Sequence, residues 1–486
     1  MENIDVKKID EYRWEIPKKG EMLVPGRIYG DRNIIDHLVA DVRAGKEWNA
    51  LRQIVNVACL PGIQRASMAM SDVHPGYGFP IGGVGAFDMK TGVISVAGVG
   101  YDANCGVRTL KTELARDDIE KKKKELAEAL FAMVPAGLGS TGDIRLSVDQ
   151  IDEILVKGAE YAVEKGYGFK DDLLYTEEDG RVRGTDPSAV SREAKQRQFK
   201  QVGTLGSGNH YLEVQYVEQI FDNVIAEAYG LKQNQILISI HCGSRALGHQ
   251  IGTDYIKVLE QATKKYKIPI KDKELVCAPF ESEEGRRYFS AVNCAINAAF
   301  ANRQAIAHLT RKAVNEAMGT DEESVKMLYD IGHNTAKLEK HLADDGKEKD
   351  LIVMRKGATR AFGPGRKEIP KAYQKVGQPV LVGGTMGTCS YILCGTEQGM
   401  LETFGSACHG AGRNMSREQA KKQWRGEGIV NELAKRGIIV KGHSLAGVAE
   451  EAPGAYKDVN EVVDVMHYSG IAKKVALLKP MICIKG

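Results

Sequence analysis

The chain has 486 residues, 43% of them hydrophobic and 27% charged, which is typical of a globular protein with a large core. Its 67 basic and 64 acidic residues nearly balance at a net charge of +3, so the overall charge does not indicate nucleic-acid binding, and any phosphate-binding surface must be local. Residues 1–19 lack the apolar core of a secretory signal, no stretch resembles a membrane span, and nine cysteines without framework spacing fit a reducing compartment, so we expect a cytoplasmic protein with no membrane contact.

Periodicity gives the predicted elements in chain order. The 3.6-residue repeat of amphipathic helices occurs in segments 117–133, 148–164, 284–317 and 416–435. Short β-branched runs predict buried strands at 93–96, 236–240, 326–329, 380–382 and 475–478. Because helices and strands do not alternate regularly, we expect an α+β fold with central β-sheets and peripheral helices, rather than a doubly wound fold or a barrel. No linker or repeat divides the chain, which favours one large domain.

The first element with chemical potential follows the strand at 93–96. In the glycine-rich run 98–106, Asp102 offers a hard oxygen ligand and Cys105 a soft thiolate, which can bridge two cations. Taken alone, an Asp-x-x-Cys sequence is more often a tight turn with a buried cysteine. A metal site therefore requires further ligands elsewhere in the chain.

Three histidines beside glycines provide such ligands. His210 follows the glycine-rich run 203–208, His241 ends the strand at 236–240, and His333 follows the strand at 326–329. A single histidine of this kind is more often structural. Four elements of one design instead indicate a shared site, with one carboxylate, one thiolate and three imidazoles for two divalent cations. This number of ligands leaves coordination positions open, which indicates catalysis.

A further histidine, His409, lies among small residues in the run 405–413. A neutral imidazole with free space on one side can attack phosphorus, although a core or metal-ligating histidine is an equally good interpretation of the residue alone. The chain has neither a P-loop nor a Lys-x-Asp-Gly motif, so histidine is the better candidate if a nucleotide is activated.

Basic residues occur near these elements and form a candidate phosphate-binding surface, the alternative being a solvated, charged loop. They are Arg355, Lys356, Arg360, Arg366 and Lys367, together with Arg245, Arg413 and Arg417. Guanidinium groups suit phosphate because they donate two parallel hydrogen bonds.

Six runs of the chain, taken in order, resemble the RtcB family of RNA ligases: 71–78, 98–106, 205–210, 241–245, 356–362 and 409–413. The resemblance extends to the terminal Gly486 and implies one RtcB-type catalytic domain over residues 1–486. It also implies GTP-dependent joining of RNA ends with a 2′,3′-cyclic phosphate or 3′-phosphate to ends with a 5′-hydroxyl, in tRNA splicing and RNA repair. The small activator archease is an implied partner.

The resemblance assigns roles to individual residues. Asp102, Cys105 and His210 are expected to hold one Mn²⁺, and Cys105, His241 and His333 a second, while His409 carries the guanylate. Expected nucleotide-binding residues are Asn209, His210, Tyr211, Leu212, Glu213, His333, Asn334, Gly383, Gly384, Thr385, Met386, Ser390, His409, Gly410, Ala411, Gly412, Tyr456 and Lys485. Arg245, Lys356, Arg413 and Arg417 are expected to contact RNA phosphates. Two departures are modest: Cys242 occupies a position where the family pattern has a small hydroxyl residue, and Tyr211 one where phenylalanine is common.

Two other functions compete with a ligase. A two-metal cyclic phosphodiesterase would use the same five ligands without a covalent intermediate, and an RNA-binding accessory protein would need none of them. A nucleophilic histidine is superfluous in both, so His409 favours the ligase.

Overall fold

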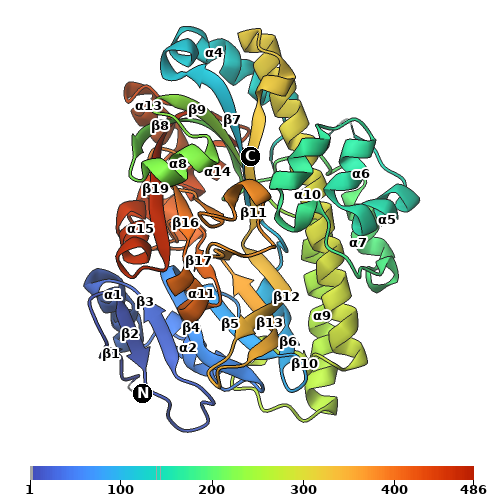
Figure 1. The fold of residues 1–486 in the computed structure, drawn as a ribbon, viewed down its shortest axis with the longest axis vertical. Coiled ribbons are helices and arrows are strands. Elements are labelled where there is room, and N and C mark those ends of the chain that lie inside the picture. Colours follow the sequence, from blue (N-terminus) through green and yellow to red (C-terminus); the bar gives the residue numbers. More distant parts are fainter. Residues whose placement is uncertain (1–3, 138, 143) are drawn as a thin grey trace.

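The computed structural model describes residues 4–137, 139–142 and 144–486. Two large β-sheets and two small ones occupy the middle of the molecule, and helices lie around them (Figure 1). This arrangement confirms the predicted α+β fold. Within the described residues, no helix is both long enough and apolar enough to cross a lipid bilayer.

The first large sheet has seven strands and contains the N-terminal part of the chain. Its strands, in spatial order, are β1 (Lys7–Lys8), β2 (Arg13–Ile16), β3 (Gly26–Tyr29), β4 (Ile63–His74), β5 (Ile81–Asp88), β13 (Glu348–Lys356) and β12 (Asn334–Leu342). Only β3 and β4 pair in parallel, and the chain between them forms helices α1 (Arg32–Arg43) and α2 (Ala50–Val57). Asp31 and Asn49 cap these helices by accepting hydrogen bonds from first-turn backbone N–H groups.

The second large sheet brings together strands that are far apart in the sequence. Its path is β11 (Lys326–Gly332), β7 (Gly106–Ala115), β9 (Gln235–Cys242), β8 (Tyr211–Ile220), β19 (Ala472–Lys485), β16 (Ser390–Gly395) and β15 (Pro379–Val382), with β18 (Ile439–Gly442) beside β19. In this register Gly106 lies opposite both Gly332 and Cys242, and Tyr211 lies opposite His241. The C-terminal ends of β11 and β9 and the N-terminal ends of β7 and β8 therefore meet at one edge of the sheet.

The small sheets position two further segments. Strand β14 (Ala358–Arg360) pairs with β17 (Ser406–Cys408), so that His409 directly follows a paired strand, and β6 (Val93–Ser95) pairs with β10 (Cys277–Pro279). A short helix, α3 (Val96–Val99), separates β6 from Gly100. The Asp102 element thus follows a helical turn, and not directly the predicted strand.

Long helices cover one side of the sheets. Figure 1 shows α9 (Arg245–Lys265) and α10 (Glu283–Met318) there, with α5 (Val148–Lys157), α6 (Ala159–Glu164) and α7 (Arg192–Gln198) outside them, and α4 (Arg116–Met133) at one end. The remaining α-helices are α8 (Asn223–Tyr229), α11 (Glu397–Thr403), α12 (Arg417–Gln423), α13 (Gly426–Lys435), α14 (Leu445–Glu450) and α15 (Val459–Tyr468).

The predicted helices at 117–133 and 284–317 are confirmed, the first with a kink at Lys122, and two others are interrupted. The segment 148–164 breaks at Gly158, where φ is +61°, a conformation that glycine adopts without strain. The segment 416–435 breaks at Trp424, whose backbone is extended. In both segments the hydrophobic periodicity continues across a residue whose backbone is not helical.

A buried ion cluster lies directly behind the meeting point of the strands. Asp330 on β11 accepts hydrogen bonds from Arg108 Nε at 2.6 Å and Arg303 Nη2 at 2.7 Å, and all three side chains are fully buried. Arg303 Nη1 also donates to the backbone carbonyls of Asn104 and Cys242. Burial opposes ionisation of Asp330, but the two guanidiniums hold its pKa below the ordinary value.

Replacing Asp330 with asparagine should therefore lower the free energy of unfolding by about 3–5 kcal/mol, because two buried guanidiniums lose their counter-charge. Denaturant titration of the wild-type and variant proteins measures this difference. The matched control is Glu113→Gln, which removes an exposed ion pair with Lys232 and should cost less than about 1 kcal/mol. Equal losses in the two variants would contradict the role of the cluster.

Candidate active site

A cavity of about 880 Å³ is lined by residues from both large sheets. Among the residues on its wall are Asp102, Cys105, His241, His333 and His409. These residues come from segments spread over more than 300 positions of the sequence, and the strand pairings described above bring them together.

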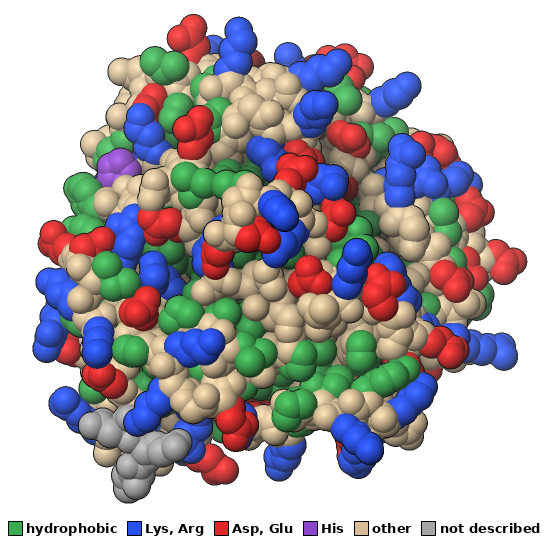
Figure 2. Space-filling view, turned by 60° about the horizontal axis from the view of Figure 1, so that its bottom comes forward, with side chains coloured by type: hydrophobic (Ala, Val, Ile, Leu, Met, Phe, Trp, Pro, Cys, Tyr) green, Lys and Arg blue, Asp and Glu red, His purple; other side chains and the backbone are tan. Residues whose placement is uncertain are grey.

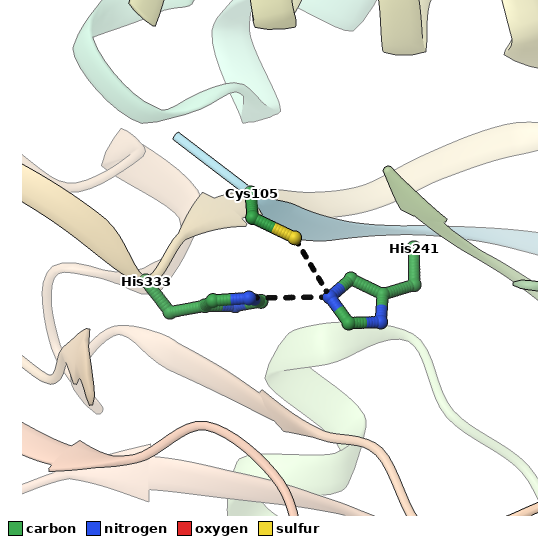
Figure 3. Close-up of side chains that lie close together, drawn as sticks. All are labelled: Cys105, His241 and His333. Carbon is green, nitrogen blue, oxygen red and sulfur yellow. Dashed lines mark hydrogen bonds between the residues drawn. The ribbon is translucent and has the colours of Figure 1, made fainter. Parts of the chain in front are cut away.

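Five potential ligand atoms converge beside this cavity. Cys105 Sγ lies 3.3 Å from His210 Nε2 and 3.2 Å from His241 Nε2. His241 Nε2 lies 3.1 Å from His333 Nε2 (Figure 3). His210 Nε2 lies 2.9 Å from Asp102 Oδ2. The atoms form two overlapping groups, Cys105 with His241 and His333, and Cys105 with Asp102 and His210.

Local backbone contacts hold the Asp102 segment in place. Asn104 has a φ of +53°, and its side-chain amide donates to the carbonyl of Ile296 on α10. Asn334 donates from its side chain to the Asp102 carbonyl, and its side-chain oxygen accepts from Gly357 N. His241 is fixed in turn, because its Nδ1 contacts the Asn209 carbonyl at 3.0 Å and leaves Nε2 facing the cluster.

The protonation states of the cluster suit cation binding. Burial lowers the pKa values of His241 and His333 well below the ordinary value, so both imidazoles are neutral and carry a lone pair. Burial also raises the pKa of Cys105 to about 12. For His210, burial lowers the pKa, but Cys105, Cys242 and Asp102 outweigh it and raise the pKa well above the ordinary value. A divalent cation would displace the protons on Cys105 and His210.

The side chains of the cluster have the chemistry that divalent cations require of their ligands. His241 and His333 are neutral and point their Nε2 atoms at each other, and His333 Nδ1 is buried without a hydrogen-bond partner in the described part of the chain. One thiol, three imidazoles and one carboxylate match the ligand preference of borderline divalent cations. The residues present therefore fit a pair of divalent cations that share Cys105 Sγ.

His409 is held by a carboxylate that the sequence interpretation missed. Asp72 Oδ2, at the end of β4, accepts from His409 Nδ1 at 2.6 Å and from His409 N at 3.0 Å, and Asp72 is fully buried. With Nδ1 protonated, the lone pair is on Nε2. The ring centroid of His409 lies 4.6 Å from that of His333, so this oriented imidazole lies beside the cluster. Asp72 belongs to the run 71–78, but nothing in the sequence pairs it with a residue 337 positions away.

Most of the expected nucleotide-binding residues lie on the cavity wall, and three do not. The wall includes Asn209, Tyr211, Glu213, His333, Asn334, Gly383, Gly384, Thr385, Met386, His409, Gly410, Ala411, Gly412, Tyr456 and Lys485. His210 lies within the ligand cluster instead. Leu212 points to the opposite face of β8 and packs in a hydrophobic core. Ser390 lies behind the wall, where its hydroxyl accepts from Gly384 N and Gln215 Nε2.

The four residues expected to contact RNA phosphates lie in different surroundings. Arg413 and Arg417 line the cavity and share the carboxylate of Glu451, at 3.3 Å and 3.1 Å. Lys356 also lines it, and burial lowers its pKa to about 7. Arg245 lies off the wall, where its Nε donates to Thr204 Oγ1.

The prediction of a wider basic surface around 355–367 is wrong for two residues, Arg355 and Arg360. Both side chains are buried. Arg355 pairs with Glu339, and Arg360 pairs with Glu177 and Glu178. On the face shown in Figure 2, basic and acidic side chains are interspersed, in keeping with the small net charge. Of the basic residues predicted around 355–367, Lys356 lines the cavity and Lys367 is exposed.

Comparisons with known proteins give a consistent result. A family model described as "tRNA-splicing ligase RtcB" matches residues 53–486. Curated proteins named tRNA-splicing ligase RtcB are similar along their whole length. The protein from Thermococcus kodakarensis is 53% identical, with 100% of both chains covered. Those from Archaeoglobus fulgidus and Methanococcus maripaludis are each 50% identical, with 100% and 99% of both chains covered.

Proposed function

The chain belongs to the RtcB family of tRNA-splicing ligases, and we propose that it is a GTP- and Mn²⁺-dependent RNA ligase. It would join ends that carry a 2′,3′-cyclic phosphate or a 3′-phosphate to ends that carry a 5′-hydroxyl. The observation that carries this proposal is the Asp72–His409 pair, which places an oriented imidazole beside the cluster of five ligands. From the family resemblance alone, we further propose tRNA halves as substrates and archease as an activator.

Asp102, Cys105 and His210 would hold one Mn²⁺, and Cys105, His241 and His333 the other. When bound, such cations neutralise phosphate charge and polarise phosphorus–oxygen bonds. Five protein ligands shared between two ions leave coordination positions for phosphate oxygens.

His409 supplies the nucleophile in this proposal. Its Nε2 lone pair attacks the α-phosphorus of GTP, an N–P bond forms, and pyrophosphate leaves. Asp72 stabilises the resulting cationic ring through Nδ1–H. An oxygen of the RNA 3′-phosphate then displaces His409 from the guanylate phosphorus, giving an RNA-3′-pp-5′-G intermediate. The 5′-hydroxyl oxygen attacks the 3′-phosphorus and GMP leaves. A cyclic phosphate must first be opened by water.

The guanine base is proposed to lie against Glu213, Tyr456 and Lys485. Guanine presents N–H donors, and Glu213 is a buried acceptor whose carboxylate also accepts from Gln215 Nε2 at 2.7 Å. The glycine-containing segments 383–386 and 409–412 would offer backbone N–H groups to phosphate oxygens.

The acceptor role of Glu213 predicts a pH dependence. Burial raises the pKa of Glu213 to about 7, so GTP affinity should increase as the pH rises through about 7 and the carboxylate ionises. Glu213→Gln should remove this dependence and weaken GTP binding at least about tenfold, because guanine loses a charged acceptor. Calorimetric titration between pH 6 and pH 8.5 measures both effects. A variant that retains the pH dependence would contradict the assignment.

The same shift predicts an opposite effect on stability. The folded pKa of about 7 exceeds the ordinary value of 4.5, so protonation stabilises the fold, and this contribution is lost as the pH rises through about 7. Without nucleotide, Glu213→Gln should therefore be more stable than wild type above pH 7, by up to about 3 kcal/mol, and equal to it below pH 5. Glu113→Gln, on the surface, is the control and should show no such difference.

A cyclic phosphodiesterase with the same metal ligands is the competing function. It needs no histidine nucleophile, and the buried Asp72 carboxylate would then orient His409 to no purpose. The ligase accounts for both residues.

The test is an RNA-joining assay with labelled strands, GTP and Mn²⁺. The wild-type protein should produce the joined strand, and His409→Ala should not, while the exposed His37→Ala control behaves like wild type. Opening of the cyclic phosphate without joining, in both wild type and His409→Ala, would overturn the ligase in favour of the phosphodiesterase.

A further inference from the structure

An exposed tryptophan stands on the wall of the candidate active-site cavity. The side chain of Trp48 is 60% exposed, whereas Trp14 is 4% exposed. Of the large hydrophobic side chains that are exposed in the described residues, Trp48 is the one that lines the cavity. The indole therefore offers a large apolar face to a ligand that enters the cavity.

The segment that carries Trp48 is held by contacts on both sides of the residue. Lys46 Nζ pairs with Asp41 Oδ1 at 2.6 Å, and Asn49 Nδ2 donates to the Lys46 carbonyl at 2.9 Å. The side chain of Asn49 also caps α2 by accepting from Arg52 N. The indole itself makes no hydrogen bond or ring contact that the structure shows among the described residues. Trp48 is therefore presented by an ordered segment and is available to a ligand.

Helix α2 is tied to the segment that orients His409. Gln53 Nε2 donates to the Gly76 carbonyl, and Gly76 N donates to Gln53 Oε1 at 3.0 Å. Gly76 lies in the same run as Asp72, and His74 from that run lines the cavity with Trp48. The backbone that carries Trp48 is thus held relative to the segment that orients His409.

We propose that Trp48 is a stacking platform for an unpaired RNA base next to the end that is joined. This inference rests on the proposed ligase function. A flat, exposed indole matches the π-face of any base, and it binds single strands without sequence preference. The guanine of GTP has a separate set of proposed partners at Glu213, Tyr456 and Lys485, so the base on Trp48 belongs to RNA.

The test compares binding of short, dye-labelled single strands with either a 5′-hydroxyl or a 3′-phosphate end. Trp48→Ala should weaken binding of at least one strand by about five- to 160-fold, the range given by loss of one base–aromatic stack. Trp48→Phe, which keeps an aromatic ring, should stay within about threefold of wild type. Leu401→Ala, which removes another exposed apolar side chain, is the matched control and should not change binding.

Strands with a single abasic position locate the stacked base. At one position near the joined end, removing the base should make wild type and Trp48→Ala bind the strand with equal affinity. At other positions, removing the base should leave the difference in affinity between the two proteins. Guanylate transfer to His409 requires no RNA, so it should be unchanged in Trp48→Ala. Wild type that joins RNA, together with Trp48→Ala that binds all strands as wild type does, would refute the stacking platform but not the ligase. The indole would then be a contact for a protein partner. If wild type joins no RNA, the ligase itself fails.

Discussion

Asp72→Asn should reduce the rate of RNA joining by about 10³- to 10⁴-fold and leave the fold intact. The carboxylate receives two hydrogen bonds from His409, through Nδ1 and the backbone N–H. An asparagine amide can donate to Nδ1, which would move the ring proton to Nε2 and remove the lone pair that attacks phosphorus. It also lacks the negative charge that stabilises the cationic ring after the N–P bond forms.

The step affected distinguishes this role from a general loss of structure. In Asp72→Asn, formation of the guanylate adduct should slow by the full factor, while binding of two Mn²⁺ and the melting temperature stay close to wild type. Asp36→Asn, on the exposed face of α1, is the control. If Asp72→Asn forms the adduct at the wild-type rate, the carboxylate does not orient His409.

Cys105→Ser should weaken binding of both Mn²⁺ ions by about 100-fold or more and abolish joining. Cys105 Sγ contacts the Nε2 atoms of both His210 and His241, so one change removes a ligand that both groups share. A serine hydroxyl does not ionise at neutral pH and is a much weaker ligand than a thiolate.

The neighbouring thiol provides a matched control. Cys242 is also buried, and its sulfur contacts the backbone carbonyls of Thr204 and Leu205. Of the five candidate ligands it approaches His210 alone, at 3.9 Å from Nδ1, which is the ring nitrogen that faces away from Cys105. Cys242→Ser can keep these contacts and should bind two Mn²⁺ normally. Titration followed by electron paramagnetic resonance counts the bound ions. Two ions bound by Cys105→Ser with unchanged affinity would exclude a bridging thiolate.

Sequence reasoning worked where the signal is local. The periodicity of 284–317 predicts α10 within one residue at each end, because a long amphipathic repeat is specific to helices. The same repeat does not predict where a helix is interrupted by a single residue with a non-helical backbone, as at Gly158 and Trp424. The strands at 236–240 and 326–329 were predicted, but their pairing was not, because pairing between β7, β8, β9 and β11 is set by contacts far apart in the sequence.

The same distinction applies to the candidate site. Asp102, Cys105 and the three histidines were grouped because each lies in or beside a glycine-containing run, and the structure brings all five together. Asp72 was missed because its partner lies 337 residues away. Arg355 and Arg360 were predicted on a surface because the carboxylates that pair with them, Glu339 and Glu177, lie in other segments of the sequence.

The most direct test of the account is incubation with α-labelled GTP and Mn²⁺, followed by denaturation and peptide mapping. We expect an acid-labile, alkali-stable guanylate on the peptide that contains His409, present in wild type and His37→Ala and absent in His409→Ala. A folded, metal-loaded protein that acquires no label, or acquires it on another residue, would contradict the proposed role of His409.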